Sequence, residues 1–263
     1  MSVSRLAFSK FLEPAEVPVL VSSFRAEGYE GLQLKGAQYA EYVNDPSRAL
    51  ASLGEDPGVY SALITGDSLD EAGQERIAAT IAFAAAVGAE RIVFCHGHPH
   101  EGVDAAMRRS FASTLTDIAS RSRDAGVAFS LHHHTDQPVM ELADFREFFD
   151  GLEPGVLGLT VDTAHLARSG VEDLPGFIDE FGAFVDNLHL KDYSIPVGRD
   201  GEWRIAGEGV LDLGGVLDAL GRAGYDGWIC VDEESDATLE EGLRRSKGWL
   251  GRHADEAPEP RAT

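Results

Sequence analysis

Gly158-Leu-Thr-Val-Asp162-Thr-Ala-His165 is the stretch that decides the fold of this 263-residue chain. Its apolar residues alternate with Thr160 and Asp162, and a β-strand places alternate side chains on opposite faces. The apolar run stops at Asp162. We therefore expect this carboxylate at the C-terminal end of a buried strand, with His165 just beyond it.

Two more apolar runs end in the same way. They are Val127-Ala-Phe-Ser-Leu-His-His-His134 and Phe184-Val-Asp-Asn-Leu-His-Leu-Lys-Asp192. A single Asp in such a place is usually a helix N-cap or a turn residue, and a lone His is usually packed or at the surface. Three successive strand ends that each deliver His or Asp are instead typical of a metal site in a parallel barrel.

The rest of the chain alternates strand-like and helix-like patterns. Eight strands alternating with helices predict one parallel sheet, closed or doubly wound. We expect residues 1–253 to form this domain and the Pro- and charge-rich residues 254–263 to be a disordered tail. The expected strands are 5–8, 31–35, 59–64, 91–98, 127–134, 157–162, 184–191 and 228–234, and the expected helices are 16–28, 39–53, 69–87, 103–124, 139–152, 174–181, 213–223 and 239–250.

Composition sets limits on the partners. With 22 basic and 45 acidic residues the net charge is −23, and the pI is near 4.6. Such a surface repels phosphate backbones and anionic membranes, so we expect binding to neither nucleic acid nor membrane. Cys95 and Cys230 lie among apolar neighbours and predict buried free thiols. No signal-peptide pattern or membrane-spanning run is seen, which favours a cytoplasmic protein; homo- and hetero-oligomers both stay open.

The ends of the last four strands offer a set of metal ligands. Nitrogen and oxygen donors without a thiolate suit Mn, Co, Zn or Mg, and imidazoles weigh against Mg, so we favour Mn. His133 points away from its neighbours and is expected to pack in the core. The candidates are Asp162 and His189, with His132 or His134 from the fifth strand and Asp232 or Glu234 from the eighth.

Lys191 and Glu234 each have a second interpretation. Lys191 shares a face with His189, so it is expected to bind a substrate oxyanion or phosphate, unless it is an exposed cation that covers apolar surface. Glu234 is either a functional carboxylate or an acidic residue near the start of the last helix.

A series of short motifs resembles a known family. The order is Asp162-x-x-His165, His189-Leu-Lys-Asp192, Gly207-Glu-Gly209 and Gly224-Tyr-Asp-Gly227 before an acidic strand. It resembles the xylose isomerase-like TIM barrels, and within them the sugar phosphate isomerase/epimerase group that includes inosose dehydratase. The resemblance implies a single (β/α)8 barrel with a divalent metal bound by Glu, Asp, His and Glu from strands five to eight.

The resemblance assigns Asp162 and His189 to the metal, with Asp232 or Glu234 in the last place. His132 stands where the family has its first glutamate. In the family's epimerases the two glutamates also form the acid/base pair, so a histidine here favours the dehydratase branch. We therefore expect His134 or His165 to act as the base, with Glu234 as a partner acid.

The implied activity is a metal-dependent lyase or isomerase that enolises a keto-sugar, keto-glycoside or keto-cyclitol. The alternatives are a sugar epimerase of the same family, and a non-catalytic sugar-binding barrel or subunit of a larger complex. A phosphodiesterase acting on abasic DNA shares the barrel, but the negative charge argues against it.

Overall fold

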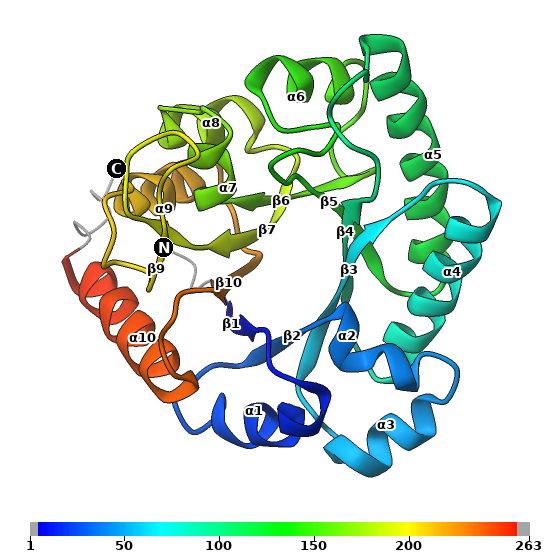
Figure 1. The fold of residues 1–263 in the computed structure, drawn as a ribbon, viewed down its shortest axis with the longest axis vertical. Helices are drawn as coiled ribbons and strands as arrows, with labels where there is room; N and C mark the ends of the chain where they lie inside the picture. Colours follow the sequence, from blue (N-terminus) through cyan, green and yellow to red (C-terminus); the bar gives the residue numbers. More distant parts are fainter. Residues whose placement is uncertain (1–4, 257–263) are drawn as a thin grey trace.

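A closed barrel of eight parallel strands forms the centre of the molecule, and helices surround it (Figure 1). The computed structural model describes residues 5–256. The strands follow one another around the barrel in the order β1-β10-β7-β6-β5-β4-β3-β2. This confirms the predicted (β/α)8 architecture. The strands are β1 (Arg5–Lys10), β2 (Gly31–Lys35), β3 (Val59–Asp67), β4 (Arg91–His96), β5 (Ala128–His132), β6 (Gly158–Asp162), β7 (Val185–Leu190) and β10 (Trp228–Glu233).

The helices follow the strands around the outside. The helix expected over 39–53 is divided, because Asp45 caps a new helix that begins at Pro46. The last helix continues to Glu256, past the expected domain end at 253; residues 257–263 of the expected tail lie outside the described residues. The α-helices are α1 (Val17–Ser23), α2 (Gly36–Tyr39), α3 (Pro46–Leu53), α4 (Glu71–Ala86), α5 (Ala105–Asp124), α6 (Leu142–Phe149), α7 (Thr163–Arg168), α8 (Leu174–Phe181), α9 (Leu213–Arg222) and α10 (Leu239–Glu256).

Strand alternation divides the side chains between two environments. Leu159 and Val161 of β6 join the large apolar core between barrel and helices. Thr160 and Asp162 of the same strand are fully buried but outside that core. Because the strands are parallel, the polar series on each strand leads to the same end of the barrel, where the strands' carboxyl ends meet.

A polar segment after β7 forms a small hairpin of β8 (Asp192–Tyr193) and β9 (Trp203–Arg204). The buried carboxylate of Asp192 holds the two ends of this segment together. It accepts hydrogen bonds from the backbone N–H groups of Tyr193, Gly207, Gly209 and Leu211. A Cβ atom at Gly209 would lie 2.2 Å from Asp192 Oδ1, so only glycine fits there. The hairpin brings Trp203 to within 5.1 Å of Lys191 Nζ, measured to the ring centroid.

Both cysteines are buried free thiols, as predicted. Among the described helices, none combines the length and the apolar character needed to cross a membrane.

Candidate active site

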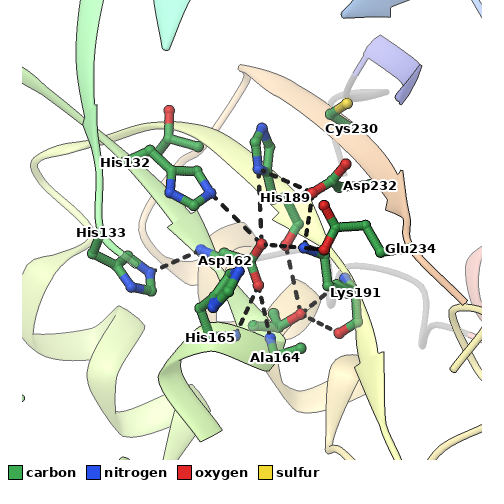
Figure 2. Close-up of polar contacts among 12 residues, drawn as sticks. His132, His133, Asp162, Ala164, His165, His189, Lys191, Cys230, Asp232 and Glu234 are labelled. Atoms are coloured by element: carbon green, nitrogen blue, oxygen red, sulfur yellow. Dashed lines mark hydrogen bonds and ion pairs between the residues drawn. The ribbon is translucent and has the colours of Figure 1, made fainter. Parts of the chain in front are cut away.

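Three side chains meet at the C-terminal end of the barrel with the donor atoms of a metal site (Figure 2). His132, Asp162 and His189 end or nearly end β5, β6 and β7, and each offers one atom within 4.8 Å of the other two. Asp162 Oδ2 lies 3.6 Å from His132 Nε2 and 3.8 Å from His189 Nδ1. All three side chains are buried, at 3% exposed or less.

Hydrogen bonds orient these donors towards one another. Asp162 Oδ1 accepts from the backbone N–H groups of Ala164 and His165 and so caps α7, which leaves Oδ2 facing the two imidazoles. His189 Nε2 is 3.1 Å from Gln33 Oε1, so it carries the proton and Nδ1 keeps its lone pair. Neither Asp162 Oδ2 nor His189 Nδ1 has a hydrogen-bond partner in the described chain. Two buried donors held in this way fit a divalent cation.

Asp232 and Glu234 lie beside this triad and are paired with two lysines. Asp232 Oδ2 is 3.8 Å from His189 Nδ1 and 2.8 Å from Lys191 Nζ. Glu234 lies beyond the end of β10, and its described contacts are with Lys35 and Lys191 and not with the triad. Lys191 is fully buried and also lies 3.1 Å from Asp162 Oδ2. Of the two interpretations of Lys191, the structure therefore supports the one that places it inside the pocket.

The remaining histidines of the site differ in their surroundings. His133 packs against Phe145, and its Nε2 accepts a hydrogen bond from the backbone N–H of Asp162, which confirms the expected core position. The rings of His134 and His165 are in contact, with centroids 3.9 Å apart and planes tilted by 40°. His165 is buried and lies 5.9 Å from the His132 ring, whereas His134 is partly exposed.

Burial and charge fix the ionisation of the pocket. Burial lowers the pKa of His165 well below its usual value and also lowers the pKa of His134, so both imidazoles are neutral. Burial, reinforced by His132, lowers the pKa of His189 to about 3, which suits a ligand. Burial opposes the charge of Lys191, but Asp162 and the two carboxylates from the β10 end outweigh it and hold its pKa well above the usual value.

Two residues of the site, Gln33 and Lys35, were not among the predicted site residues. Both come from β2, where they share a face, and both are buried. Polar side chains inside a short apolar strand are rarely buried without a role, and this was the available signal. Their sequence distance from Asp162 and His189 hid the contact, because only the closed barrel brings β2 near β7.

A family match covers most of the barrel. Residues 24–253 match the xylose isomerase-like TIM barrel family. This chain belongs to the xylose isomerase-like TIM barrels. The zinc-bound crystal structure of the IOLI protein superposes on it with a TM-score of 0.75, at 16% identity, over 97% of this chain and 100% of that one. At that identity the superposition shows that the two share a fold.

The curated relatives of this xylose isomerase-like barrel include inosose dehydratases. The protein from Lacticaseibacillus casei is 28% identical over 139 residues, which is 48% of this chain and 46% of that protein. The chain thus spans about half the length of the first curated relatives it matches. Inosose dehydratase 1 of Bacillus cereus is 25% identical over 248 residues, covering 83% of this chain and 82% of that protein.

Proposed function

We propose that this protein is a metal-dependent enzyme that removes the proton next to the carbonyl group of a keto-sugar or keto-cyclitol. Elimination of a β-substituent, a dehydratase reaction, is the leading outcome, and isomerisation is the other. The observation that carries the proposal is the buried triad of His132, Asp162 and His189 with Lys191 against it. The similarity to inosose dehydratases supports the dehydratase outcome.

His132, Asp162 and His189 would hold the metal, and we propose Asp232 as the fourth ligand. Both carboxylates pair with the two lysines, but Asp232 also lies 3.8 Å from His189 Nδ1, whereas the described contacts of Glu234 do not include the triad. Two imidazoles and two carboxylates suit Mn, Co or Zn, and we favour Mn. A bound divalent cation would polarise the carbonyl group and so acidify the neighbouring C–H.

The charges of the pocket support enolate chemistry. Two ammonium groups, Lys35 and Lys191, face three carboxylates, Asp162, Asp232 and Glu234. When His132 is a neutral metal ligand, the carboxylates exceed the ammonium groups by one, so a divalent cation would turn the excess negative charge into an excess positive charge. An enolate is an anion, and a buried site preorganised for that charge stabilises the transition state rather than the neutral ketone. In this role Lys191 binds the substrate oxyanion.

The proton would be taken by His134 or His165. Both are neutral imidazoles beside the metal triad, and neither is itself a member of it. His134 is the more accessible of the two, and His165 is the nearer to Asp162, whose side chain caps the helix that begins there. Glu234 is partly exposed and would be the partner acid. Burial raises the pKa of Glu234, but Lys191 and Lys35 outweigh burial and lower it, so Glu234 would have to take up a proton before it acts as an acid.

The test is metal analysis combined with solvent-deuterium exchange into candidate ketoses and keto-cyclitols. Exchange that depends on the metal is expected. His134→Asn or His165→Asn should keep the metal and slow exchange by about 10²–10⁴-fold, the usual contribution of a general base. If both variants exchange at the parent rate, a carboxylate is the base and the epimerase alternative replaces the dehydratase. Metal without exchange on any ketose tried would favour a sugar-binding barrel or a subunit of a larger complex.

A further inference from the structure

The carboxylate of Glu234 is held by two lysines, one on each of its oxygens (Figure 2 shows Lys191). Lys35 Nζ lies 2.5 Å from Oε1, and Lys191 Nζ lies 2.9 Å from Oε2. The lysines come from β2 and from the residue after β7, and both are buried, at 7% and 2% exposed. The two lysines therefore form a binding site for a carboxylate, which the side chain of Glu234 occupies.

Glu234 is held less firmly than the lysines that bind it. It lies outside β10, which ends at Glu233, and its side chain is 30% exposed. Within the described chain its carboxylate contacts only the two lysines. A cavity of about 430 Å³ opens directly beside it, bounded by Trp203, Ile205 and Asp236 among others. A rotation of the Glu234 side chain into this cavity would free the lysines without disturbing the barrel.

The freed lysines would need another anion. Asp232 would still lie 2.9 Å from Lys35 and 2.8 Å from Lys191, and Asp162 would still lie 3.1 Å from Lys191. Both aspartates are proposed metal ligands, so with the metal bound the two ammonium groups would lack a carboxylate of their own. A buried unpaired charge is strongly unfavourable, whereas a ligand carboxylate would restore both hydrogen bonds. Lys191 is also 3.1 Å from Asp162 Oδ2, so a group bound by the lysines lies next to the metal triad.

We propose that Lys35 and Lys191 form a carboxylate subsite that Glu234 fills in the free protein, and that the substrate is a keto-acid whose carboxylate displaces Glu234. This inference rests on the proposed function and narrows its substrate class from keto-sugars in general to those that carry an acid group. Lys35 belongs to this subsite and not to the metal triad, because its described ionic contacts are with Asp232 and Glu234.

A matched pair of ligands tests the subsite. L-Sorbose and 5-keto-D-gluconate differ only in having a CH₂OH or a carboxylate at one end, and glucose and glucuronate form a second pair. Binding to the Mn-loaded full chain is measured by calorimetry. Each acid should bind at least tenfold more tightly than its neutral partner. Lys35→Met should lower acid affinity by about 10- to 100-fold, the range of a hydrogen bond to a charged group, and should lower affinity for the neutral sugar by clearly less.

Three further variants separate the subsite from general damage. Glu234→Gln should raise acid affinity severalfold, because the competing carboxylate is gone, and Lys35→Arg should retain the preference for acids. Lys10→Met is the matched control, since Lys10 is a largely buried lysine at the same barrel end that pairs with Glu233. If Lys35→Met does not fold, Lys35→Met/Glu234→Gln removes one charge of each sign and should still lose the acid preference.

Equal affinity for acid and neutral partners in the parent protein would overturn the proposal. So would acid binding too weak to measure in both the parent and Glu234→Gln, or equal losses for acid and sugar in Lys35→Met. These outcomes are distinct from failure of the proposed function, which is read from deuterium exchange. Calorimetry reports acid binding whether or not exchange occurs.

Discussion

At the scale of single residues, Asp162 combines two roles that the sequence presented as alternatives. One oxygen caps α7, and the other faces His132 and His189. Asp162→Ala would lose the cap as well as the ligand, at about 1 kcal/mol for the cap. Asp162→Asn keeps an oxygen for the cap and removes the charge.

We expect Asp162→Asn to lower metal affinity by at least about tenfold, because a neutral amide is a poor ligand for a divalent cation. Metal content after dialysis measures this. Asp173→Asn is the matched control, because Asp173 caps α8 through the N–H of Gly176 away from the site. Full occupancy in Asp162→Asn would show that the triad is not the metal site.

Gln33 fixes which nitrogen of His189 is free. Its Oε1 faces His189 Nε2 and also accepts from Ser61 Oγ. Methionine is similar in size to glutamine but has no oxygen to accept this hydrogen bond. We expect Gln33→Met to lower metal affinity by about 10- to 100-fold, the usual effect of removing a residue that hydrogen-bonds to a metal ligand. Gln33→Glu keeps an acceptor and should retain tight binding. Titration with a metal indicator compares the variants, and unchanged affinity in Gln33→Met would remove Gln33 from this role.

His96 predicts a pH dependence of stability. It is buried against Phe111, and burial, together with His98, lowers its pKa from 6.5 to about 4. Between those values the unfolded chain binds a proton that the folded chain does not. His96 therefore costs no stability above pH 6.5, and stability is lost as pH falls towards 4, by up to about 3 kcal/mol.

Urea unfolding of the parent protein and His96→Asn at pH 7, 5.5 and 4 checks this expectation. Asparagine can still accept the hydrogen bond that His96 Nδ1 takes from the N–H of His98, but it does not titrate. The variant should lose less stability than the parent over this interval. If the free energy of unfolding falls equally in both proteins between pH 7 and pH 4, a group other than His96 causes the loss of stability in acid.

At the scale of elements, Asp192 is the anchor of the β8–β9 hairpin. Its four backbone hydrogen bonds hold together the segment that carries Trp203 over Lys191. Asp192→Ala should destabilise the protein by about 3 kcal/mol, because several N–H groups lose a charged acceptor at once. It should also speed proteolytic cleavage between 194 and 209. Asp212→Ala, which removes the exposed cap of α9, is the control; equal cleavage rates would contradict the anchoring role.

The elements also show what the sequence could and could not predict. The end of β6 was predicted to the residue because its apolar run stops at Asp162. The strands expected over 91–98 and 127–134 end two residues earlier, at His96 and His132, and β3 continues to Asp67, past the expected end at 64. The helix Leu174–Phe181 was predicted to the residue, and Asp173 caps its start. Helix α7 was missed because it begins directly after Asp162, without a linker. The division of the 39–53 segment was missed, although Pro46 was visible. The site residues of β5 to β10 were predictable from strand alternation, but Gln33 and Lys35 depend on barrel closure, a long-range property.

At the scale of the whole molecule, the metal should contribute to stability. A ligand that binds only the folded state at about 1,000 times its Kd adds roughly 4 kcal/mol. For a chain of this size that corresponds to a shift in Tm of about 10 °C. Removing metal with a chelator should lower Tm by this order, and the shift should be clearly smaller in Asp162→Asn, whose metal affinity is reduced. A chelator effect of equal size in Asp162→Asn would place the stabilising ion elsewhere.

The pairing of β1 with β10 has a consequence for the order in which the protein is made. The two strands pair over six residues, from Arg5 with Trp228 to Lys10 with Glu233. The barrel is therefore closed by two segments that lie far apart in the sequence. At 5–20 residues per second a ribosome needs roughly 10 to 45 seconds to travel between them. During that time the growing sheet has two open edges, and Asp232, which lies on the sealing strand, has yet to reach the triad. The nascent chain is thus exposed to aggregation until β10 emerges, and the pocket is completed only after β10 has been synthesised.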